Sequence, residues 1–436
     1  MHEEAVDAVV PWGALFSVHM YLLLMARWPR AKIPRPGCLP TEIWIEIFEC
    51  FCSDDTTEFT GYNAARDYLC SCCPQWNLLI EATGIFWKRL SITCVTSVSE
   101  IERHVRCATI HEDISMDVVI ALDINDVWGP DFEGEPSGFL HESDIVYRLS
   151  VAAECLIVAA PTVVHWRRVC LSAATEDFMA IIITTFLHLP APELTSLLLA
   201  CPTYVFGLHR NCDRLFIQPP ALFNRAVPKL DYLRIINAVL PWGDPAFFAN
   251  LDTLDFGSIP VIAWPAPSQL ISSLIIASNL TFLEFGGGGV IKSKTEVITA
   301  FTLPSLRSLS IDHWTDCDLI LDVLAQGVFP SLYRLFLADF EESSWIRLLA
   351  MDLFSRIHTL VLRGWVVYPD HILAMFSQLK VLRASNDSTR LARLDVYHEL
   401  KDPQIPAFFH TLGVISSCVS EFYMLPRLVN CCAQTV

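Results

Sequence analysis

A phrase of the form L-x-x-L-x-L recurs through the second half of the chain, and it limits the possible folds more than any other feature. The residues that lead its eight copies are Leu194, Leu230, Leu251, Leu280, Leu306, Leu332, Ile357 and Leu379. Successive copies start 21 to 36 residues apart, and a weaker copy precedes them at Trp166. A unit of this length cannot bury its apolar face alone, so the copies must pack against one another in a row.

Within each copy, the fourth and sixth residues point to the same side of a short strand, because side chains alternate along a strand. Between copies the spacing becomes helical. The stretch 316–327 places Leu319, Ile320 and Val323 on one face of a helix, with Asp318 and Asp322 on the other. The sequence therefore predicts strands that alternate with helices, and hence a mixed α/β fold.

The composition supplies a large apolar core and argues against a polyanionic partner. Hydrophobic residues make up 53% of the 436 residues, and the net charge is −18. Because phosphate binding needs clustered lysine and arginine, we do not expect nucleic acid as the main partner. The 16 cysteines fall irregularly inside apolar runs, which is typical of small buried thiols in a reducing compartment.

The stretch 38–52, CLPTEIWIEIFECFC, predicts a helix that is apolar on almost all sides. Glu42, Glu46 and Glu49 fall in one narrow stripe when the helix turns by about 100° per residue. Most of the remaining surface is apolar and includes Ile43 and Phe48. Such a helix needs cover from its own domain on one side and from a second body on the other.

A second apolar series follows this helix, and the two series together resemble an F-box. The matching residues are Leu39, Pro40, Glu42, Ile43, Ile47, Phe48, Leu69, Cys73, Trp76, Phe86 and Trp87. They follow the order L-P-x-E-I-x-x-x-I-F, then L-x-x-x-C-x-x-W, then F-W, over about 50 residues. The repeats resemble the leucine-rich-repeat family over about 230 residues. The chain is therefore similar to fungal-type F-box/leucine-rich-repeat substrate receptors.

This resemblance implies a small helical F-box domain followed by an irregular leucine-rich-repeat solenoid, or horseshoe. The implied segments are an apolar N-terminal segment at 1–36, the F-box at 37–92, a connecting region with an acidic loop and the first irregular repeats at 93–160, the leucine-rich repeats at 161–390, and a C-terminal cap or tail at 391–436. It also implies the substrate-recognition subunit of an SCF-type (Skp–cullin–F-box) ubiquitin ligase, with no catalytic residues and no cofactor. The expected partners are a Skp-type adaptor, a cullin reached through that adaptor, and an unknown protein substrate.

The resemblance also points to residues for the adaptor contact. They are Leu39, Pro40, Ile43, Ile47, Phe48 and Trp76. For Ile47 and Trp76, packing within the F-box itself is the alternative role. Pro74 lies inside the second helix of the pattern, where a proline breaks or kinks a helix. A repeat-based scaffold or binding protein with a non-functional F-box is therefore the alternative to the ligase subunit.

In a repeat horseshoe, the outward-pointing strand residues line the concave side. The residues expected to hold a substrate are Phe282, Glu284, Asp312, Arg334, Phe336, Arg363 and Arg383. Acids occupy the middle repeats and arginines the last three, which suits a partner whose charges run the opposite way. Ordinary solvated strand residues are the alternative interpretation.

Residues 9–26, VVPWGALFSVHMYLLLMA, are at the lower limit of length for a membrane span. Pro11, Gly13 and the acids that precede them disfavour an anchor or a signal peptide, so we expect a buried or partner-bound amphipathic helix. A cytoplasmic or nuclear location follows, with an N-terminal anchor as the minor alternative. The C-x-x-C at residues 70–73 lacks a second pair at zinc spacing, and no catalytic motif supports an enzyme.

Overall fold

The structure is a computed structural model in which the chain forms two compact units, Met1–Val169 and Cys170–Val436. The boundary between the two units falls inside strand β3 (Trp166–Ala173). The residues that the structure describes are 40–52, 59–111, 114–122, 142–173, 176–186, 188–201, 222–238, 242–257, 259, 264–286, 290, 298–312, 318–338, 344, 347–348, 351, 357–363, 393–397 and 421–424. The division of the chain into five segments remains a prediction.

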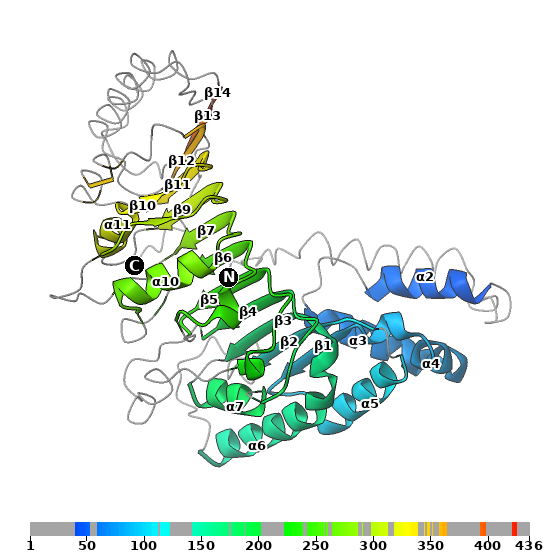
Figure 1. Cartoon of the computed structure of the whole chain (residues 1–436). Coiled ribbons are helices and arrows are strands. Elements are labelled where there is room, and N and C mark those ends of the chain that lie inside the picture. The colour runs from blue at the N-terminus through cyan, green and yellow to red at the C-terminus, as the bar shows by residue number, and fades with distance from the viewer. Residues whose placement is uncertain are drawn as a thin grey trace, which may run out of the picture. The chain divides into compact units, whose positions relative to one another are not determined.

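The first unit combines a group of helices with a pair of parallel strands (Figure 1). Its helical elements are α2 (Thr41–Cys52), α3 (Phe59–Cys72), α4 (Pro74–Glu81), η2 (Gly84–Trp87), α5 (Val98–Thr109), α6 (Glu142–Ala159) and η4 (Ala160–His165). The strands are β1 (Arg89–Thr93) and β2 (Met116–Leu122). Leu90 pairs with Val118 and Ile92 with Ile120, and all four side chains are buried.

The helix break predicted at Pro74 is confirmed. Helix α3 ends at Cys72, and Cys73 takes an extended conformation with φ −161° and ψ 155°. Pro74 then occupies the first turn of α4, where its missing N–H and fixed φ do no harm. The proline therefore divides one expected helix into two shorter ones.

One helix in the described part of the chain, Val146–His165, is long and apolar enough to cross a membrane by length and composition. This stretch consists of most of α6 followed by η4. One side of it is buried inside the first unit, through Ala152, Cys155 and Leu156. A helix packed on a protein core meets the same criteria. Residues 9–26, the stretch that the sequence marks as apolar, lie outside the described residues.

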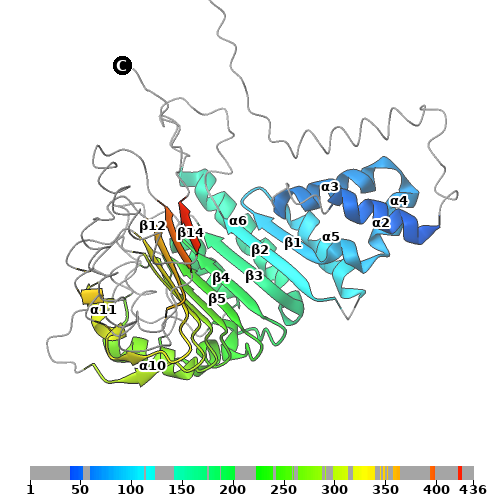
Figure 2. The same cartoon turned by 90° about the horizontal axis from the view of Figure 1, so that it is seen from above.

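The second unit is built on a parallel sheet whose strand order follows the order of the chain. After β3 its strands are β4 (Ser196–Ala200), β5 (Tyr232–Ile236), β6 (Thr253–Phe256), β7 (Phe282–Phe285), β9 (Ser308–Asp312), β11 (Arg334–Ala338), β12 (Thr359–Arg363), β13 (Arg393–Tyr397) and β14 (Glu421–Met424). Figure 2 shows these strands side by side. A separate parallel pair joins β8 (Phe301–Thr302) to β10 (Gly327–Val328).

Seven of the predicted strands are present, and each begins two residues after the leading residue of its copy. The leucines at the fourth position stand opposite one another across neighbouring strands. They form a leucine column of Leu197, Leu233, Leu254, Leu283, Leu309, Leu335 and Leu360. Every one of them is fully buried. The period-two pattern of the repeats therefore sets both the register of the sheet and its buried face. The eighth copy, at Leu379, lies outside the described residues.

The connections between these strands are uneven. The described helices of this unit are α7 (Glu176–Phe186), η5 (Leu222–Arg225), α9 (Pro245–Phe248), α10 (Pro267–Ile276) and α11 (Asp318–Leu324). The predicted helical face at 316–327 is present in α11, where Ile320 and Val323 are buried. The connecting helices range from about one turn in α9 to about three turns in α7, and the unit is an α/β arrangement around a parallel sheet. The predicted mixed α/β class is confirmed, and the solenoid remains a prediction.

The leucine column provides a direct test of the register. Leu283→Ala removes a fully buried side chain between Leu254 and Leu309, so we expect the free energy of unfolding to fall by about 2–5 kcal/mol. Ser308→Ala alters the opposite face of the next strand and should change it by less than about 0.5 kcal/mol. Urea unfolding followed by circular dichroism measures both. Equal effects of the two substitutions would contradict the assigned burial.

Candidate functional site

Helix α2 carries two apolar stripes that face different surroundings. Trp44, Phe48 and Cys52, spaced four residues apart, are buried. Ile43 and Ile47, also four apart, are each 39% exposed, and Phe51 one turn further is 40% exposed. Residues at this spacing lie above one another on a helix. Of the two covers predicted from the sequence, the structure shows the one from the helix's own domain, and the second stripe is open to solvent.

The inner stripe packs into an aromatic cluster. The ring of Trp76, from α4, lies 5.4 Å from that of Trp44 and 4.8 Å from that of Phe48. Phe48 also contacts Phe86, with ring centroids 6.4 Å apart. Burial raises the pKa of the Cys52 thiol to about 12, so Cys52 fills this core as a small apolar side chain. The cluster fixes which side of α2 faces inward.

The outer stripe continues onto the neighbouring helix. Tyr68 of α3 is 50% exposed, and its ring lies 6.4 Å from that of Phe51. We call Ile43, Ile47, Phe51 and Tyr68 together the α2 face. Large apolar side chains grouped on the surface of a helix mark interaction sites more often than isolated ones do.

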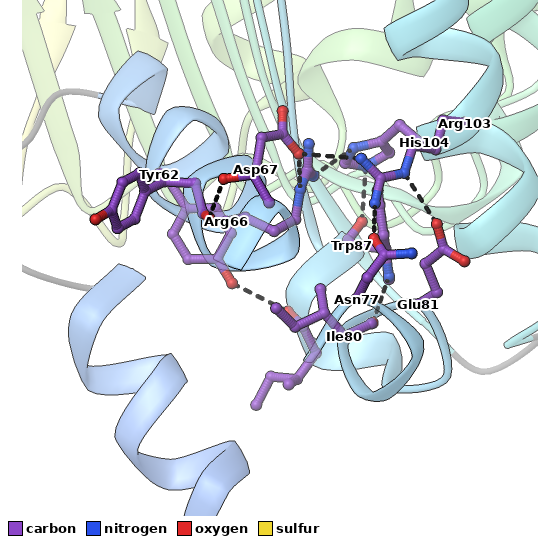
Figure 3. Close-up of polar contacts among 12 residues, drawn as sticks. Tyr62, Arg66, Asp67, Asn77, Ile80, Glu81, Trp87, Arg103 and His104 are labelled. Carbon is purple, nitrogen blue, oxygen red and sulfur yellow. Dashed lines mark hydrogen bonds and ion pairs between the residues drawn. The ribbon is translucent and has the colours of Figure 1, made fainter. Parts of the chain in front are cut away.

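Behind the α2 face, a buried arginine ties α3 to the core of the unit. The guanidinium carbon of Arg66 lies 4.2 Å from the centre of the Trp87 ring, and Arg66 Nε is 3.1 Å from a carboxylate oxygen of Asp67. Arg66 Nη1 is 3.0 Å from Nδ1 of His104 in α5 (Figure 3). A buried guanidinium needs such partners to offset its lost hydration. Arg66 thus joins α3, η2 and α5 at one point.

The protonation of His104 follows from these contacts. Arginine has only donors, so Arg66 donates to His104 Nδ1, and the ring proton sits on Nε2. From there it is donated to the backbone carbonyl oxygen of Trp87, 2.9 Å away. Burial, and then the charge of Arg66, lowers the pKa of His104 to about 3. His104 is therefore neutral in the folded unit.

Arg103 connects α5 to α4 in the same region. Its guanidinium donates to Glu81 at 3.1 Å and to Asn77 at 2.6 Å (Figure 3). The indole N–H of Trp87 donates to the carbonyl oxygen of Ile80 at 2.9 Å. With the Arg66 contacts, these bonds hold α3, α4 and α5 as one block behind the α2 face.

The residues expected to contact an adaptor differ in their exposure to solvent. Pro40, Ile43 and Ile47 are exposed, whereas Leu39 lies outside the described residues. Phe48 is only 1% exposed, because it is held between Trp76 and Phe86, and a partner cannot reach it in this arrangement. Trp76 is half-buried in the same cluster. We therefore leave Phe48 and Trp76 out of the exposed surface.

Phe51 and Tyr68 belong to the α2 face although the expected set of residues omitted them. Phe51 follows Ile47 by four residues, so the helical spacing could have identified it. Tyr68 comes from another helix, and no local pattern in the sequence connects it to α2. The exposed surface is thus larger toward the C-terminal end of α2 than the sequence suggested.

A second surface lies on the sheet of the second unit, on the face opposite the leucine column. Arg234, Asp255, Glu284 and Ser310 stand opposite one another in four neighbouring strands, and we call them the polar row. Arg234 Nε lies 2.9 Å from Oδ2 of Asp255, which is only 7% exposed. Burial raises the pKa of Asp255, while the charge of Arg234 opposes this rise. Asp255 and Ser310 are thus buried within the row, whereas the side chain of Arg234 is 43% exposed.

Most residues expected to hold a substrate lie beside this row. Burial, followed by the nearby charge of Asp255, raises the pKa of Glu284. Phe336 continues the row beyond Ser310, and Phe282 and Arg334 flank Ser308 in the adjacent row. Asp312 ends β9, and the side chain of Arg363 and all of Arg383 lie outside the described residues. The structure therefore places Phe282 and Glu284 on β7 and Arg334 and Phe336 on β11, the two strands that flank β9.

No family model matches the sequence, and no curated protein matches it. Among solved structures, a protein from Bacteroides fragilis is similar at 10% identity with a TM-score of 0.30, over 60% of this chain and 66% of that protein. This chain thus spans just under two thirds of the length of that protein. A chain of the Rad7 and Elc1 complex from yeast is similar at 11% identity with a TM-score of 0.27, over 99% of this chain and 96% of that one. At TM-scores this low, neither likeness carries an argument about this chain.

The neutral state of His104 predicts a specific pH dependence. Its pKa of about 3 in the folded chain lies below the ordinary value of 6.5. The associated stability is therefore complete above pH 6.5 and decreases by up to about 1.4 kcal/mol per pH unit as the pH falls toward 3.

His104→Gln retains an acceptor and a donor at this position but cannot be protonated in this range. We expect urea unfolding at several pH values to show a smaller loss of stability between pH 6.5 and pH 4 for this variant than for the natural chain. Identical pH profiles would contradict a buried neutral His104.

Proposed function

We propose that this chain is the substrate-recognition subunit of an SCF-type ubiquitin ligase. In this proposal the first unit docks a Skp-type adaptor, and the leucine repeats of the second unit hold a protein substrate. The observation that carries it is the α2 face, where Ile43, Ile47 and Phe51 stay open to solvent although the neighbouring stripe of the same helix is packed. The match to the F-box pattern at Ile43 and Ile47 supports it.

The geometry of the α2 face suits docking onto a preformed partner. Trp44 and Phe48 anchor α2 through Trp76, while Arg66 and Arg103 hold the helices behind it. A face on such a support loses little conformational freedom on binding, so more of its apolar burial contributes to affinity. Helices that present residues at i, i+4 and i+8 commonly insert them into a partner's apolar groove. Pro40, exposed beside this stripe, would extend the contact toward Leu39.

The substrate surface in this proposal is the face of the sheet that carries the polar row. A leucine-rich-repeat horseshoe would present this face as its concave side. The residues proposed to contact the substrate are Phe282, Glu284, Asp312, Arg334, Phe336, Arg363 and Arg383. Phe282 and Phe336 supply aromatic anchors, and the desolvated acids favour a substrate that carries basic groups.

The mechanism proposed is proximity. The chain forms and breaks no bonds, but it holds the substrate near a ubiquitin-loaded enzyme that the cullin brings to the complex. Tethering raises the local concentration of substrate lysines into the millimolar range or above. A cytoplasmic or nuclear location accords with this role and with the free thiols in the core.

One observation favours a second candidate function, a repeat-based scaffold that binds no adaptor. The helix break at Cys73 and Pro74 departs from the F-box pattern and separates Trp76 from α3. A scaffold of this kind would use the sheet of the second unit alone. Binding of the adaptor to the full chain distinguishes the two functions.

The adaptor contact predicts a loss of binding from the outer stripe alone. Ile43→Asp combined with Ile47→Asp places two charges in the centre of the α2 face, so we expect the affinity of the full chain for a Skp-type adaptor to fall at least about 100-fold. Leu78→Asp, at a side chain that is 65% exposed on α4, is the matched control and should leave the affinity unchanged. Titration calorimetry with purified adaptor measures all three chains. If the natural chain itself does not bind, the scaffold is favoured.

The substrate surface predicts that substrate capture and adaptor binding are separable. Arg334→Glu combined with Phe336→Ala alters one strand of the proposed surface. We expect the reconstituted ligase to lose most ubiquitylation of its substrates, while its affinity for the adaptor is retained. Tyr333→Ala removes an aromatic side chain that is also exposed but precedes the strand, and it serves as the control. Unchanged ubiquitylation, measured by quantitative mass spectrometry, would refute this placement.

A further inference from the structure

The α2 face has an acidic edge as well as an apolar centre. On a helical wheel, Cys50 falls beside Ile43 and Ile47, and Glu46, Glu42 and Glu49 follow along one side of them. Glu42, Glu46 and Cys50 are exposed, and Glu49 is half-buried. A partner that fits this face would therefore combine apolar side chains with positive charge beside them.

The chain carries a segment of this chemistry close to α2. Residues 9–26 are almost entirely apolar and include Leu22, Leu23 and Leu24. The next residues, 27–35, contain four bases and no acid: Arg27, Arg30, Lys32 and Arg35. The order of apolar and basic residues in this segment thus matches the two parts of the α2 face. The described elements of the first unit include a second exposed apolar set, on α6 around Ile157, but among the side chains described on that helix only Glu154 is negatively charged.

The connection between the segment and α2 is long enough for contact within one chain. Residues 27–40 separate them, and 14 residues can span up to about 46 Å when extended. Helix α2 itself is about 18 Å long. A short tether of this kind gives an effective concentration in the millimolar range, so even weak complementarity produces a largely bound state.

We propose that residues 9–26 bind the α2 face in the same chain, with the basic residues of 27–35 against Glu42, Glu46 and Glu49. This inference rests on the proposed function, because the covered face is the one proposed to dock the adaptor. When the adaptor is absent, residues 9–26 cover that face. The adaptor must displace the segment, so the segment lowers the apparent affinity of the chain for its adaptor.

Cys50 reports directly on this cover. Its side chain is exposed between the apolar stripe and the acidic edge of the face, so N-ethylmaleimide labels it quickly when the face is open and slowly when it is covered. The test compares the full-length chain with the variant Leu22→Asp, Leu23→Asp, Leu24→Asp. We expect Cys50 to react at least about tenfold faster in the variant, as peptide mass spectrometry measures, while Cys170 of the second unit reacts equally in both. Equal Cys50 rates would overturn the proposal.

Charge reversal provides a second and sharper comparison. Arg27→Glu, Arg30→Glu and Lys32→Glu together should accelerate the labelling of Cys50, and so should Glu42→Lys, Glu46→Lys and Glu49→Lys. Combining all six restores opposite charges across the contact and should restore the slow rate. Additive acceleration in the combined variant would overturn the contact. Equal Cys50 rates, together with binding of the natural chain but not the Leu22→Asp, Leu23→Asp, Leu24→Asp chain to phosphatidylcholine–phosphatidylserine vesicles, would assign the segment to a lipid surface instead.

A measurement with the purified adaptor distinguishes failure of this proposal from failure of the proposed function on which it rests. Purified Skp-type adaptor should protect Cys50 in the Leu22→Asp, Leu23→Asp, Leu24→Asp chain at about tenfold lower concentration than is needed for binding to the natural chain. If the variant labels faster but the adaptor does not protect it, the cover stands and the proposed adaptor contact fails. If the adaptor protects both chains at the same concentration and the Cys50 rates are equal, the cover fails and the adaptor contact stands.

Discussion

The contact of seven leucines across neighbouring parallel strands governs the second unit. Each of these seven strands contributes one fully buried leucine, and the leucines of adjacent strands stand opposite one another. A shift of any strand by one residue would turn its leucine to solvent and bring polar residues into the core, so the register is strongly specified. The polar row on the opposite face follows from this constraint, because alternation along each strand places Arg234, Asp255 and Glu284 together. The acids are thus brought into line by the packing of side chains on the other face.

In the first unit, polar and aromatic contacts around one tryptophan fix the arrangement of the elements. Helix α4 of this unit has only eight residues, so helical propensity alone gives it little stability. Trp87 compensates by contacts on several sides: Arg66 over its ring, His104 against its edge, and its own N–H bonded to Ile80. These polar contacts have directions, unlike the aliphatic packing of the sheet. They fix the mutual orientation of the helices and thereby decide which stripe of α2 is left exposed.

The sequence predicted the parts of this molecule that a local period encodes. Strand starts followed the leading residue of each copy, and Pro74 marked the end of one helix and the start of another. A further strand, β13, follows the same frame through Leu391, Leu394 and Val396, and extending the pattern would have found it. The uneven connections could not be predicted in the same way, since turns of different length satisfy one strand spacing.

The candidate sites were less predictable for a physical reason. A helical wheel separates acidic from apolar residues, but it cannot tell an apolar stripe that packs inward from one that remains outside. Phe48 and Ile47 are adjacent and equally apolar, and only the position of Trp76 in another helix distinguishes them. The pair of Arg66 and His104, 38 residues apart, has no local signature at all. Contacts between distant elements decide function here, and they require the three-dimensional arrangement.

In the sheet of the second unit, neighbours in space are also neighbours in the chain. A strand and its connection can therefore be duplicated or lost without rerouting any other part of the backbone, because the strands on either side simply meet new partners of the same kind. An added strand needs one leucine at the position that continues the leucine column. A sheet built in this way can gain or lose strands over evolutionary time while the packing of its leucine column stays the same. The face that carries the polar row then changes in length, which allows one architecture to acquire different binding partners.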